Sequence, residues 1–154
     1  MPERNKVAWG VWKTASPEEL QSLAERLGRT AQWGDVWALV GPLGVGKTCF
    51  AQGFARGLDI TVPVLSPSFV LVREYRGRLP LFHVDVYRLE TVEEALAIGL
   101  EEYLPGPGVT IVEWAEKIEA LLPPEHIRVD LAFANAGREV RITLPPNRRE
   151  ALLP

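Results

Sequence analysis

The sequence of 154 residues predicts an α/β fold, a three-layer sandwich with helices on both faces of a mixed, partly antiparallel central sheet. Apolar segments of strand length alternate with segments of helical periodicity along the chain. A glycine-rich loop joins a buried strand at 35–40 to a helix that begins near Lys47. Alternating apolar and polar residues at 68–87 and 127–144 indicate two β-hairpins, which add antiparallel pairs to the sheet. The length predicts a single domain over residues 1–154.

A short strand and a capped helix are expected before the glycine-rich loop. Residues 7–12 have the composition of a strand. Ser16 can cap a helix, Pro17 suits the first helical position, and Glu19 completes a capping box. Leucines follow at helical spacing, and Gly28 is expected to end this helix.

The loop after the 35–40 strand matches the phosphate-binding pattern G-x-x-x-x-G-K-[ST] in full, through Gly41, Pro42, Leu43, Gly44, Val45, Gly46, Lys47 and Thr48. The glycines let successive backbone N–H groups point into one concavity, and the following helix adds the positive end of its dipole. Lys47 can reach the β- and γ-phosphates of a nucleotide, and the Thr48 hydroxyl can ligate Mg²⁺. Because the order strand, loop, helix is the one this motif requires, the fold is predicted to be of the P-loop NTPase type.

A hairpin and a second capped helix are expected in the middle of the chain. The hairpin spans 68–87 and turns at 76–78. Thr91 opens a capping box, and a helix should run from there to about Leu104. The Pro-Gly repeat at 105–108 ends that helix.

A continuous apolar strand at 109–112 finishes on Glu113. An apolar strand that ends in an acid, downstream of a P-loop, is typical of a Walker B element, whose acid lies beside the phosphate site. The second hairpin turns at 135–137, and residues from about 145 to 154 are expected to form a tail.

The composition limits the possible partners and compartments. A net charge of −3 argues against a protein that grips DNA or RNA alone through a large basic face, although a local patch stays possible. The single cysteine, Cys49, allows no intramolecular disulfide and is expected to be a packed thiol. No stretch approaches about 18 apolar residues, and residues 1–13 lack the apolar centre of a signal peptide. These features predict a cytoplasmic protein without a membrane span.

Two acids are candidates for supporting a metal ion and a water: Asp85, in a strand of the first hairpin, and Glu113. On spacing alone, the alternative for each is an ordinary surface acid. The Ser68 hydroxyl can sense a γ-phosphate in the manner of a switch, or simply belong to a turn. His83 lies between apolar residues and is expected to pack or hydrogen-bond rather than to act as a base or a metal ligand.

Trp114 and a group of four arginines each allow two interpretations. Trp114 either flanks a nucleotide or partner, or is buried. The arginines form either a solvated rim around the first hairpin or a docking surface for an acidic partner or RNA phosphates; they are Arg73, Arg76, Arg78 and Arg88.

Three functions fit these residues. The sequence lacks the guanine-reading pattern N-K-x-D, so ATP with Mg²⁺ is the expected ligand pair, and an ATPase is the first hypothesis. A small-molecule P-loop kinase is the second, and it needs an acceptor pocket and usually an arginine over the phosphates. The third is a nucleotide-gated interaction module in which turnover is not required.

Five blocks, spread over about residues 16–144, together resemble the bacterial TsaE family, formerly called YjeE. The resemblance implies a slow, partner-stimulated P-loop ATP hydrolase needed for the tRNA modification N6-threonylcarbamoyladenosine at adenosine 37. It also implies that homologues of TsaD and TsaB are the partners, that ATP drives assembly or resetting of their complex, and that tRNA is contacted through the complex. The blocks are the P-loop at 41–48, Ser-Pro-Ser-Phe at 66–69, His-Val-Asp-Val-Tyr-Arg-Leu at 83–89, Gly-Leu-Glu-Glu-Tyr-Leu at 99–104 and Ile-Val-Glu-Trp-Ala-Glu at 111–116.

The resemblance also implies roles for single residues. Lys47 and the loop backbone hold the phosphates, Thr48 and Glu113 ligate Mg²⁺, and Asp85 supports hydrolysis through the metal or the water. Further nucleotide contacts carried over from the family are Ser68, Trp114, Gly137 and Arg138. Two positions depart from the family: Pro42 replaces an acid after the first loop glycine, and Ser68 replaces a threonine but keeps the hydroxyl.

Overall fold

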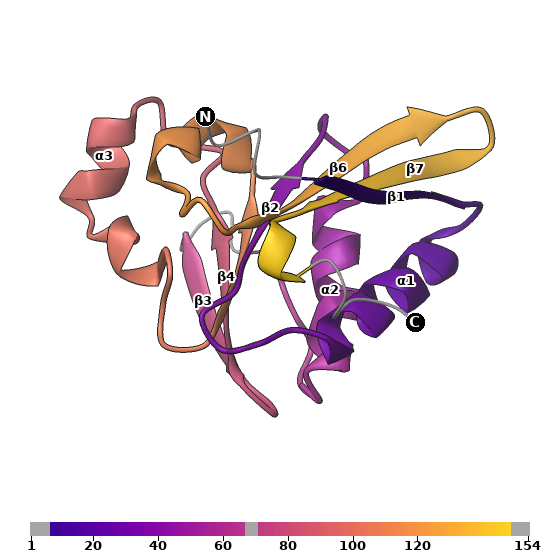
Figure 1. The fold of residues 1–154 in the computed structure, drawn as a ribbon, viewed down its shortest axis with the longest axis horizontal. Coiled ribbons are helices and arrows are strands. Elements are labelled where there is room, and N and C mark those ends of the chain that lie inside the picture. Colours follow the sequence, from indigo (N-terminus) through magenta and orange to yellow (C-terminus); the bar gives the residue numbers. More distant parts are fainter. Residues whose placement is uncertain (1–6, 67–70, 149–154) are drawn as a thin grey trace.

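The computed structural model describes residues 7–66 and 71–148, and the side chains within that part except those of residues 7–9 and 147. These residues form one seven-stranded sheet with helices on both faces (Figure 1). The strands are β1 (Val7–Thr14), β2 (Val36–Val40), β3 (Val72–Arg76), β4 (Pro80–Asp85), β5 (Val109–Glu113), β6 (Ile127–Ala134) and β7 (Gly137–Leu144). The helices are α1 (Pro17–Arg29), α2 (Lys47–Gly57) and α3 (Val92–Ala97), with shorter 3₁₀ helices η2 (Leu100–Tyr103), η3 (Ala115–Leu121) and η4 (Pro146–Arg148).

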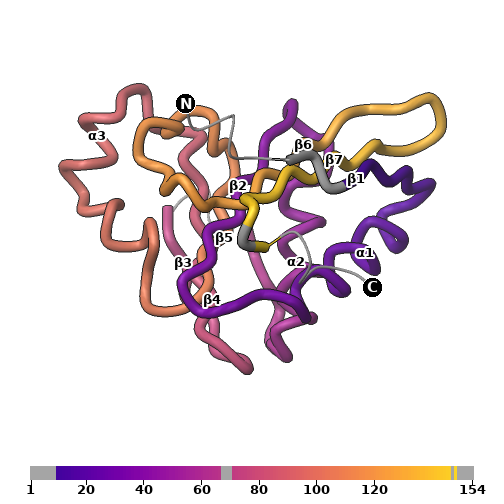
Figure 2. The backbone as a smooth tube through the Cα atoms, viewed as in Figure 1, coloured from indigo at the N-terminus to yellow at the C-terminus, as the bar shows by residue number. Residues whose placement is uncertain are grey.

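The sheet has the strand order β1-β7-β6-β2-β5-β4-β3 and is mixed, as the sequence predicts. Its centre, β6-β2-β5-β4, is parallel. The outer pairs β1–β7, β6–β7 and β3–β4 are antiparallel, so each predicted hairpin contributes one strand to the parallel centre. Figure 2 follows the backbone through β5, which lies between β2 and β4 in the middle of the sheet. Glu113 therefore ends a strand that is flanked on both sides.

Alternation along the central strands builds a separate apolar core on each face of the sheet. In β2, Trp37 and Leu39 pack with α1 and α2, whereas Val36 and Ala38 pack with α3 and the 3₁₀ helices. Trp37 meets Phe54 of α2 edge to face at 4.8 Å between ring centroids. The three-layer α/β prediction is confirmed, and no helix in the described part of the chain is long and apolar enough to cross a membrane.

The capping box that opens α1 is confirmed. The Ser16 hydroxyl accepts a hydrogen bond from the Glu19 amide at 3.1 Å, and the Glu19 carboxylate accepts one from the Ala15 amide at 2.9 Å. The predicted stop at Gly28 is wrong, because α1 continues to Arg29. A Cβ on Gly28 would lie 2.2 Å from the carbonyl oxygen of Phe54 in α2. This glycine therefore serves the close approach of α1 and α2 rather than a helix end.

The predicted helix from Thr91 to Leu104 is two shorter elements. Thr91 caps α3 as expected, since its hydroxyl accepts a hydrogen bond from the Glu94 amide at 3.2 Å. The α-helix stops at Ala97, and Gly99 adopts a left-handed conformation with φ of 76°, after which η2 begins. The turn at Gly99 was missed because the apolar residues on either side of it keep a helical spacing.

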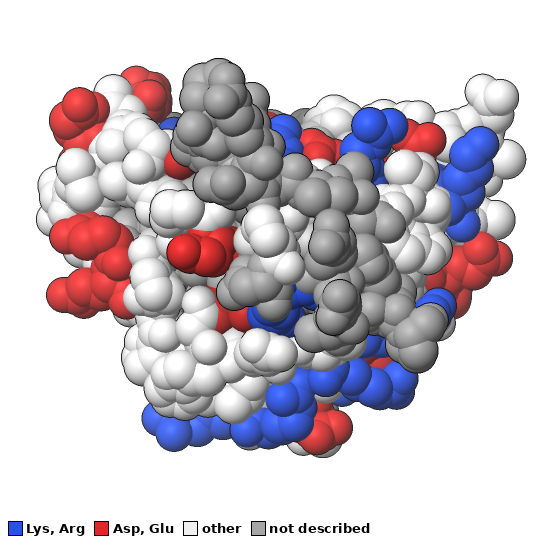
Figure 3. Space-filling model, in the orientation of Figure 1, with Lys and Arg blue, Asp and Glu red and all other residues white. Residues whose placement is uncertain are grey.

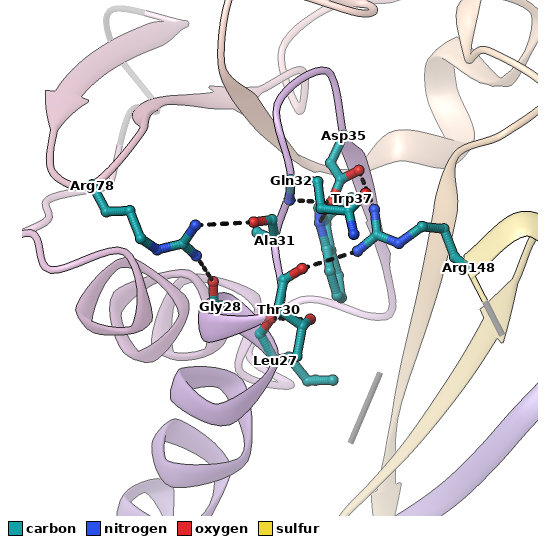
Figure 4. A network of polar contacts seen from close by, with 9 residues as sticks. All are labelled: Leu27, Gly28, Thr30, Ala31, Gln32, Asp35, Trp37, Arg78 and Arg148. Carbon is teal, nitrogen blue, oxygen red and sulfur yellow. Dashed lines mark hydrogen bonds and ion pairs between the residues drawn. The ribbon is translucent and has the colours of Figure 1, made fainter. Parts of the chain in front are cut away.

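Two arginines from distant parts of the chain satisfy the carbonyl groups at the end of α1 (Figure 4). Arg78 donates to the carbonyl oxygens of Gly28 at 2.9 Å and Ala31 at 3.2 Å. Arg148 donates to the Thr30 carbonyl oxygen at 3.1 Å and forms an ion pair with the Asp35 carboxylate. Cations suit this end of a helix, where the macrodipole is negative. The segment predicted as a tail is thus held to the fold at Arg148, and residues 149–154 lie outside the described part.

We expect Arg148→Ala to lower the free energy of unfolding by about 3 kcal/mol, because it leaves the Asp35 carboxylate buried without its cation. The side chains of this pair are 6% and 10% exposed. Arg76→Ala is the matched control, since Arg76 pairs with Glu74 at 84% and 46% exposure and such pairs contribute little. Urea unfolding of both variants measures the difference, and equal midpoints would show that Arg148 does not anchor the segment.

Candidate nucleotide-binding site

The loop between β2 and α2 has the backbone that phosphate binding requires. Gly44 and Gly46 adopt φ values of 78° and 118°, which side-chain-bearing residues rarely reach. Gly46 is the N-cap of α2, and no side chain in the described part caps this helix end. The amide groups of the first turn, which no intrahelical carbonyl can satisfy, are therefore available to an anion.

Lys47 is the first residue of α2 and points across the loop. Its Nζ donates to the carbonyl oxygens of Gly41 and Pro42, the latter at 2.9 Å, and lies 3.9 Å from the ring centroid of Trp114. Burial lowers the pKa of Lys47 from its ordinary value, while the carboxylates of Glu116, Glu113 and Asp85 act in the opposite direction. A bound triphosphate would add negative charge at the same place and would favour the charged ammonium further.

Thr48 and Glu113 meet directly at the end of β5. The Thr48 hydroxyl lies 3.0 Å from Oε1 and 3.1 Å from Oε2 of the Glu113 carboxylate, which is only 3% exposed. Mg²⁺ takes oxygen ligands at about 2.0–2.1 Å in octahedral geometry, which puts adjacent ligands about 2.9 Å apart. The observed oxygen separation fits two neighbouring ligands of such an ion.

Asp85 is brought to Glu113 by the register of the sheet, in which the two residues are paired partners of β4 and β5. The Asp85 side chain is 5% exposed, and its Oδ1 accepts a hydrogen bond from the Tyr87 amide at 2.8 Å. Asp85 and Glu113 are therefore buried acids beside the P-loop, and the reading of either as a solvated surface acid is wrong. No group of three His, Cys, Asp or Glu residues suited to a metal occurs in the described part, so a metal here would need phosphate oxygens in addition to the Thr48 hydroxyl and the Glu113 carboxylate.

These residues line a cavity of about 510 Å³ over the amino end of α2. Its size suits a small ligand. Trp114 forms one wall of this cavity. Its backbone has a φ of 62°, and the centroid of its ring lies 4.9 Å from the ring centroid of Tyr87. The lining residues are Leu43, Gly44, Gly46, Lys47, Thr48, Cys49, Ser66, Asp85, Tyr87, Arg88, Glu113 and Trp114.

A second cavity of about 500 Å³ continues from the first along the P-loop, since Gly44, Gly46 and Cys49 line both. Its far side is formed by residues 15–17 and by the 134–138 turn between β6 and β7. Arg138 donates from Nε to the carbonyl oxygen of Val45 at 2.8 Å, so the predicted Gly137–Arg138 pair does lie beside the loop.

Three of the four arginines around the first hairpin have different roles in the fold. Arg78 donates hydrogen bonds to carbonyl oxygens at the end of α1, and Arg76 pairs with Glu74. Of these four described arginines, Arg88 alone lines the first cavity. Figure 3 shows Lys and Arg along the lower edge of this face and acidic side chains on the left, over the region of α3.

Three further residues complete the comparison with the sequence. Cys49 is half-buried and packs against the apolar core, as predicted, while also lining both cavities; burial raises the pKa of its thiol. Ser68 lies outside the described residues.

His83 hydrogen-bonds as predicted, but its partner is Glu113, at 2.6 Å from Nε2 to Oε2. The two-residue spacing of His83 and Asp85 puts both on one face of β4, but only the register of β4 on β5 brings that face to Glu113.

Comparison with known proteins gives a consistent set of relatives. The family model described as "Threonylcarbamoyl adenosine biosynthesis protein TsaE" matches residues 14–141. The chain is 46% identical to a tRNA threonylcarbamoyladenosine biosynthesis protein TsaE of Bacillus subtilis (strain 168), over 92% of this chain and 89% of that protein. It is 41% identical to the protein of the same name from Treponema pallidum (strain Nichols), over 75% and 87%. The crystal structure of Bacillus subtilis YdiB superposes with a TM-score of 0.78 at 41% identity, covering 94% of this chain and 89% of that one.

Proposed function

The chain belongs to the TsaE family, which acts in tRNA threonylcarbamoyladenosine biosynthesis, and from this membership we propose that it is an Mg²⁺-dependent ATPase. One observation carries the proposal: Thr48 of the P-loop lies 3.0 Å from the buried Glu113 carboxylate, at the uncapped amino end of α2. A helix end that can accept phosphate oxygens and two oxygens at the separation of neighbouring metal ligands thus lie in one cavity, which supports the proposal. ATP is the proposed substrate, because the sequence lacks a guanine-reading motif.

In the proposed hydrolysis, the residues of this cavity have separate roles. The amides of the first turn of α2 and the Lys47 ammonium bind and orient the phosphates. Thr48 and Glu113 hold Mg²⁺, which when bound neutralises charge on the transferred phosphoryl group. The Asp85 carboxylate orients the attacking water, and Arg88 adds positive charge at the cavity wall. The Trp114 ring excludes water from the side facing Lys47.

The second cavity is the proposed site of the nucleoside. It adjoins the phosphate loop through Gly44 and Gly46, and Arg138 holds the loop from that side. Ser68 stays a predicted γ-phosphate contact on the basis of the family resemblance alone.

The proposed partners are homologues of TsaD and TsaB, in the cytoplasm. A net charge of −3 supports contact with tRNA through this complex rather than by this chain alone, and no role on DNA or membranes is proposed. ATP occupancy or hydrolysis would then control assembly or resetting of the complex.

We expect the purified chain to release labelled phosphate from γ-labelled ATP slowly, and faster when the TsaD and TsaB homologues are added. Phosphate release and metabolite labelling are measured in the same reaction. Transfer of the label to a small-molecule acceptor would overturn the ATPase proposal in favour of a kinase. The kinase reading has one observation in its support, the position of Arg88 at the cavity wall.

A further inference from the structure

His83 is a buried polar residue that the proposed chemistry does not use. It lies in β4, is 0% exposed, and places Nε2 2.6 Å from Oε2 of Glu113. In the register of β4 and β5, His83 pairs with Ile111 and Asp85 pairs with Glu113. Since residues two apart in a strand share a face, His83 and Asp85 both stand on the face that carries Glu113.

The two oxygens of the Glu113 carboxylate have different surroundings. Both lie within hydrogen-bond distance of the Thr48 hydroxyl, but only Oε2 also contacts His83. An ionised carboxylate accepts hydrogen bonds and cannot donate them, so Nε2 carries the proton of this contact. A carboxylate with one oxygen held by a ring N–H cannot rotate freely, which keeps Oε1, the oxygen that His83 does not contact, 3.0 Å from the Thr48 hydroxyl.

The second ring nitrogen of His83, Nδ1, indicates that a histidine at this position lowers the stability of the fold. His83 Nδ1 is buried and has no hydrogen-bond partner among the described residues. A buried polar atom without a partner destabilises a fold, and an apolar side chain at a fully buried position avoids that penalty. Packing alone therefore favours an apolar residue at position 83, and the bond to Glu113 is the interaction that requires a histidine.

We propose that His83 is a positioning residue: its Nε2–H fixes the Glu113 carboxylate so that Oε1 and the Thr48 hydroxyl are presented together as metal ligands. Ligating carboxylates are commonly oriented by such an outer hydrogen bond, whose loss weakens metal binding about 10- to 100-fold. The inference rests on the proposed function, because it assumes that Mg²⁺ binds at this site with a nucleotide.

The test compares His83→Leu, which removes the donor, with His83→Gln, whose amide nitrogen can replace Nε2. Affinity for a non-hydrolysable ATP analogue is measured by calorimetry across a range of Mg²⁺ concentrations, and stability by urea unfolding. In His83→Leu we expect the Mg²⁺ concentration for the half-maximal effect to rise at least tenfold, with metal-free affinity unchanged, in a protein that urea unfolding shows to be folded. His83→Gln should restore most of the metal response.

The other histidine of the chain supplies the control. His126 bonds to the Pro123 carbonyl oxygen at 2.7 Å and lines neither cavity, so His126→Leu should leave the Mg²⁺ response unchanged. If His83→Leu does not fold, His83→Met replaces it. An unchanged Mg²⁺ response in a folded donor-free variant, or no recovery in His83→Gln, overturns the positioning role alone. An unmodified chain whose nucleotide affinity does not depend on Mg²⁺ would overturn the proposed function, and this inference with it.

Discussion

Replacing Lys47 with Ala is expected to weaken binding of Mg²⁺·ATP at least about a hundredfold while the fold persists. The side chain supplies the ammonium beside the phosphate position, and charged hydrogen bonds of this kind contribute about 1.5–3 kcal/mol each. Its contacts with the Gly41 and Pro42 carbonyl oxygens also organise the loop before a nucleotide binds. Calorimetry with a non-hydrolysable analogue measures the affinity, and circular dichroism checks the fold.

Lys117 provides a matched control for this substitution. Its Nζ also donates to main-chain carbonyl oxygens, those of Tyr87 and Leu89, but Lys117 does not line the cavity. We expect Lys117→Ala to bind the analogue as the unmodified chain does. Equal affinities of the Lys47→Ala and Lys117→Ala proteins for the analogue would show that the phosphates do not bind at the amino end of α2.

Glu113→Gln is expected to lower the rate of ATP hydrolysis by a factor on the order of a hundred or more. The amide keeps the shape of the side chain but loses the charge that a metal ligand needs. The Thr48 hydroxyl can still donate to the amide oxygen, so the structure around it should persist. Phosphate release at saturating ATP, measured over a Mg²⁺ titration, gives the rate and the metal dependence together.

The neighbouring acid Glu116 is the control for charge alone. Glu116 is exposed and acts on Lys47 only through its charge, so Glu116→Gln should retain most of the activity. If Glu113→Gln hydrolyses ATP at the unmodified rate, the metal assignment fails. If it hydrolyses none but still binds the TsaD and TsaB homologues with ATP and supports modification, the chain is a nucleotide-gated module and turnover is incidental.

The sequence predicted those features whose signals are local. The P-loop and the capping boxes at Ser16 and Thr91 each lie within a few consecutive residues, each hairpin is one continuous stretch of the chain, and the structure contains all of them. Glu113 was found because an apolar strand ending in an acid is itself a short pattern. The mixed character of the sheet around it followed from the combination of two hairpins with a P-loop unit, whereas the order of the strands was not predicted.

Features that depend on contacts across the fold were not predictable in the same way. The pairing of Asp85 with Glu113, and the contact of His83 with Glu113, follow from the register of β4 on β5, which spacing along the chain does not define. The same holds for Arg78 and Arg148, which meet the end of α1 from positions far along the chain. A charge count could not separate these arginines from solvated ones, because their partners, main-chain carbonyl groups and for Arg148 also the Asp35 carboxylate, lie far from them in the sequence.

A crystal structure with Mg²⁺ and a non-hydrolysable ATP analogue tests the central claim most directly. We predict that the triphosphate lies over the amino end of α2, with Lys47 on its terminal phosphates and the metal bound by the Thr48 hydroxyl and Oε1 of Glu113. Asp85 should lie beside that metal or its water. A nucleotide bound elsewhere, or a Glu113 side chain turned away from the metal, would contradict the account.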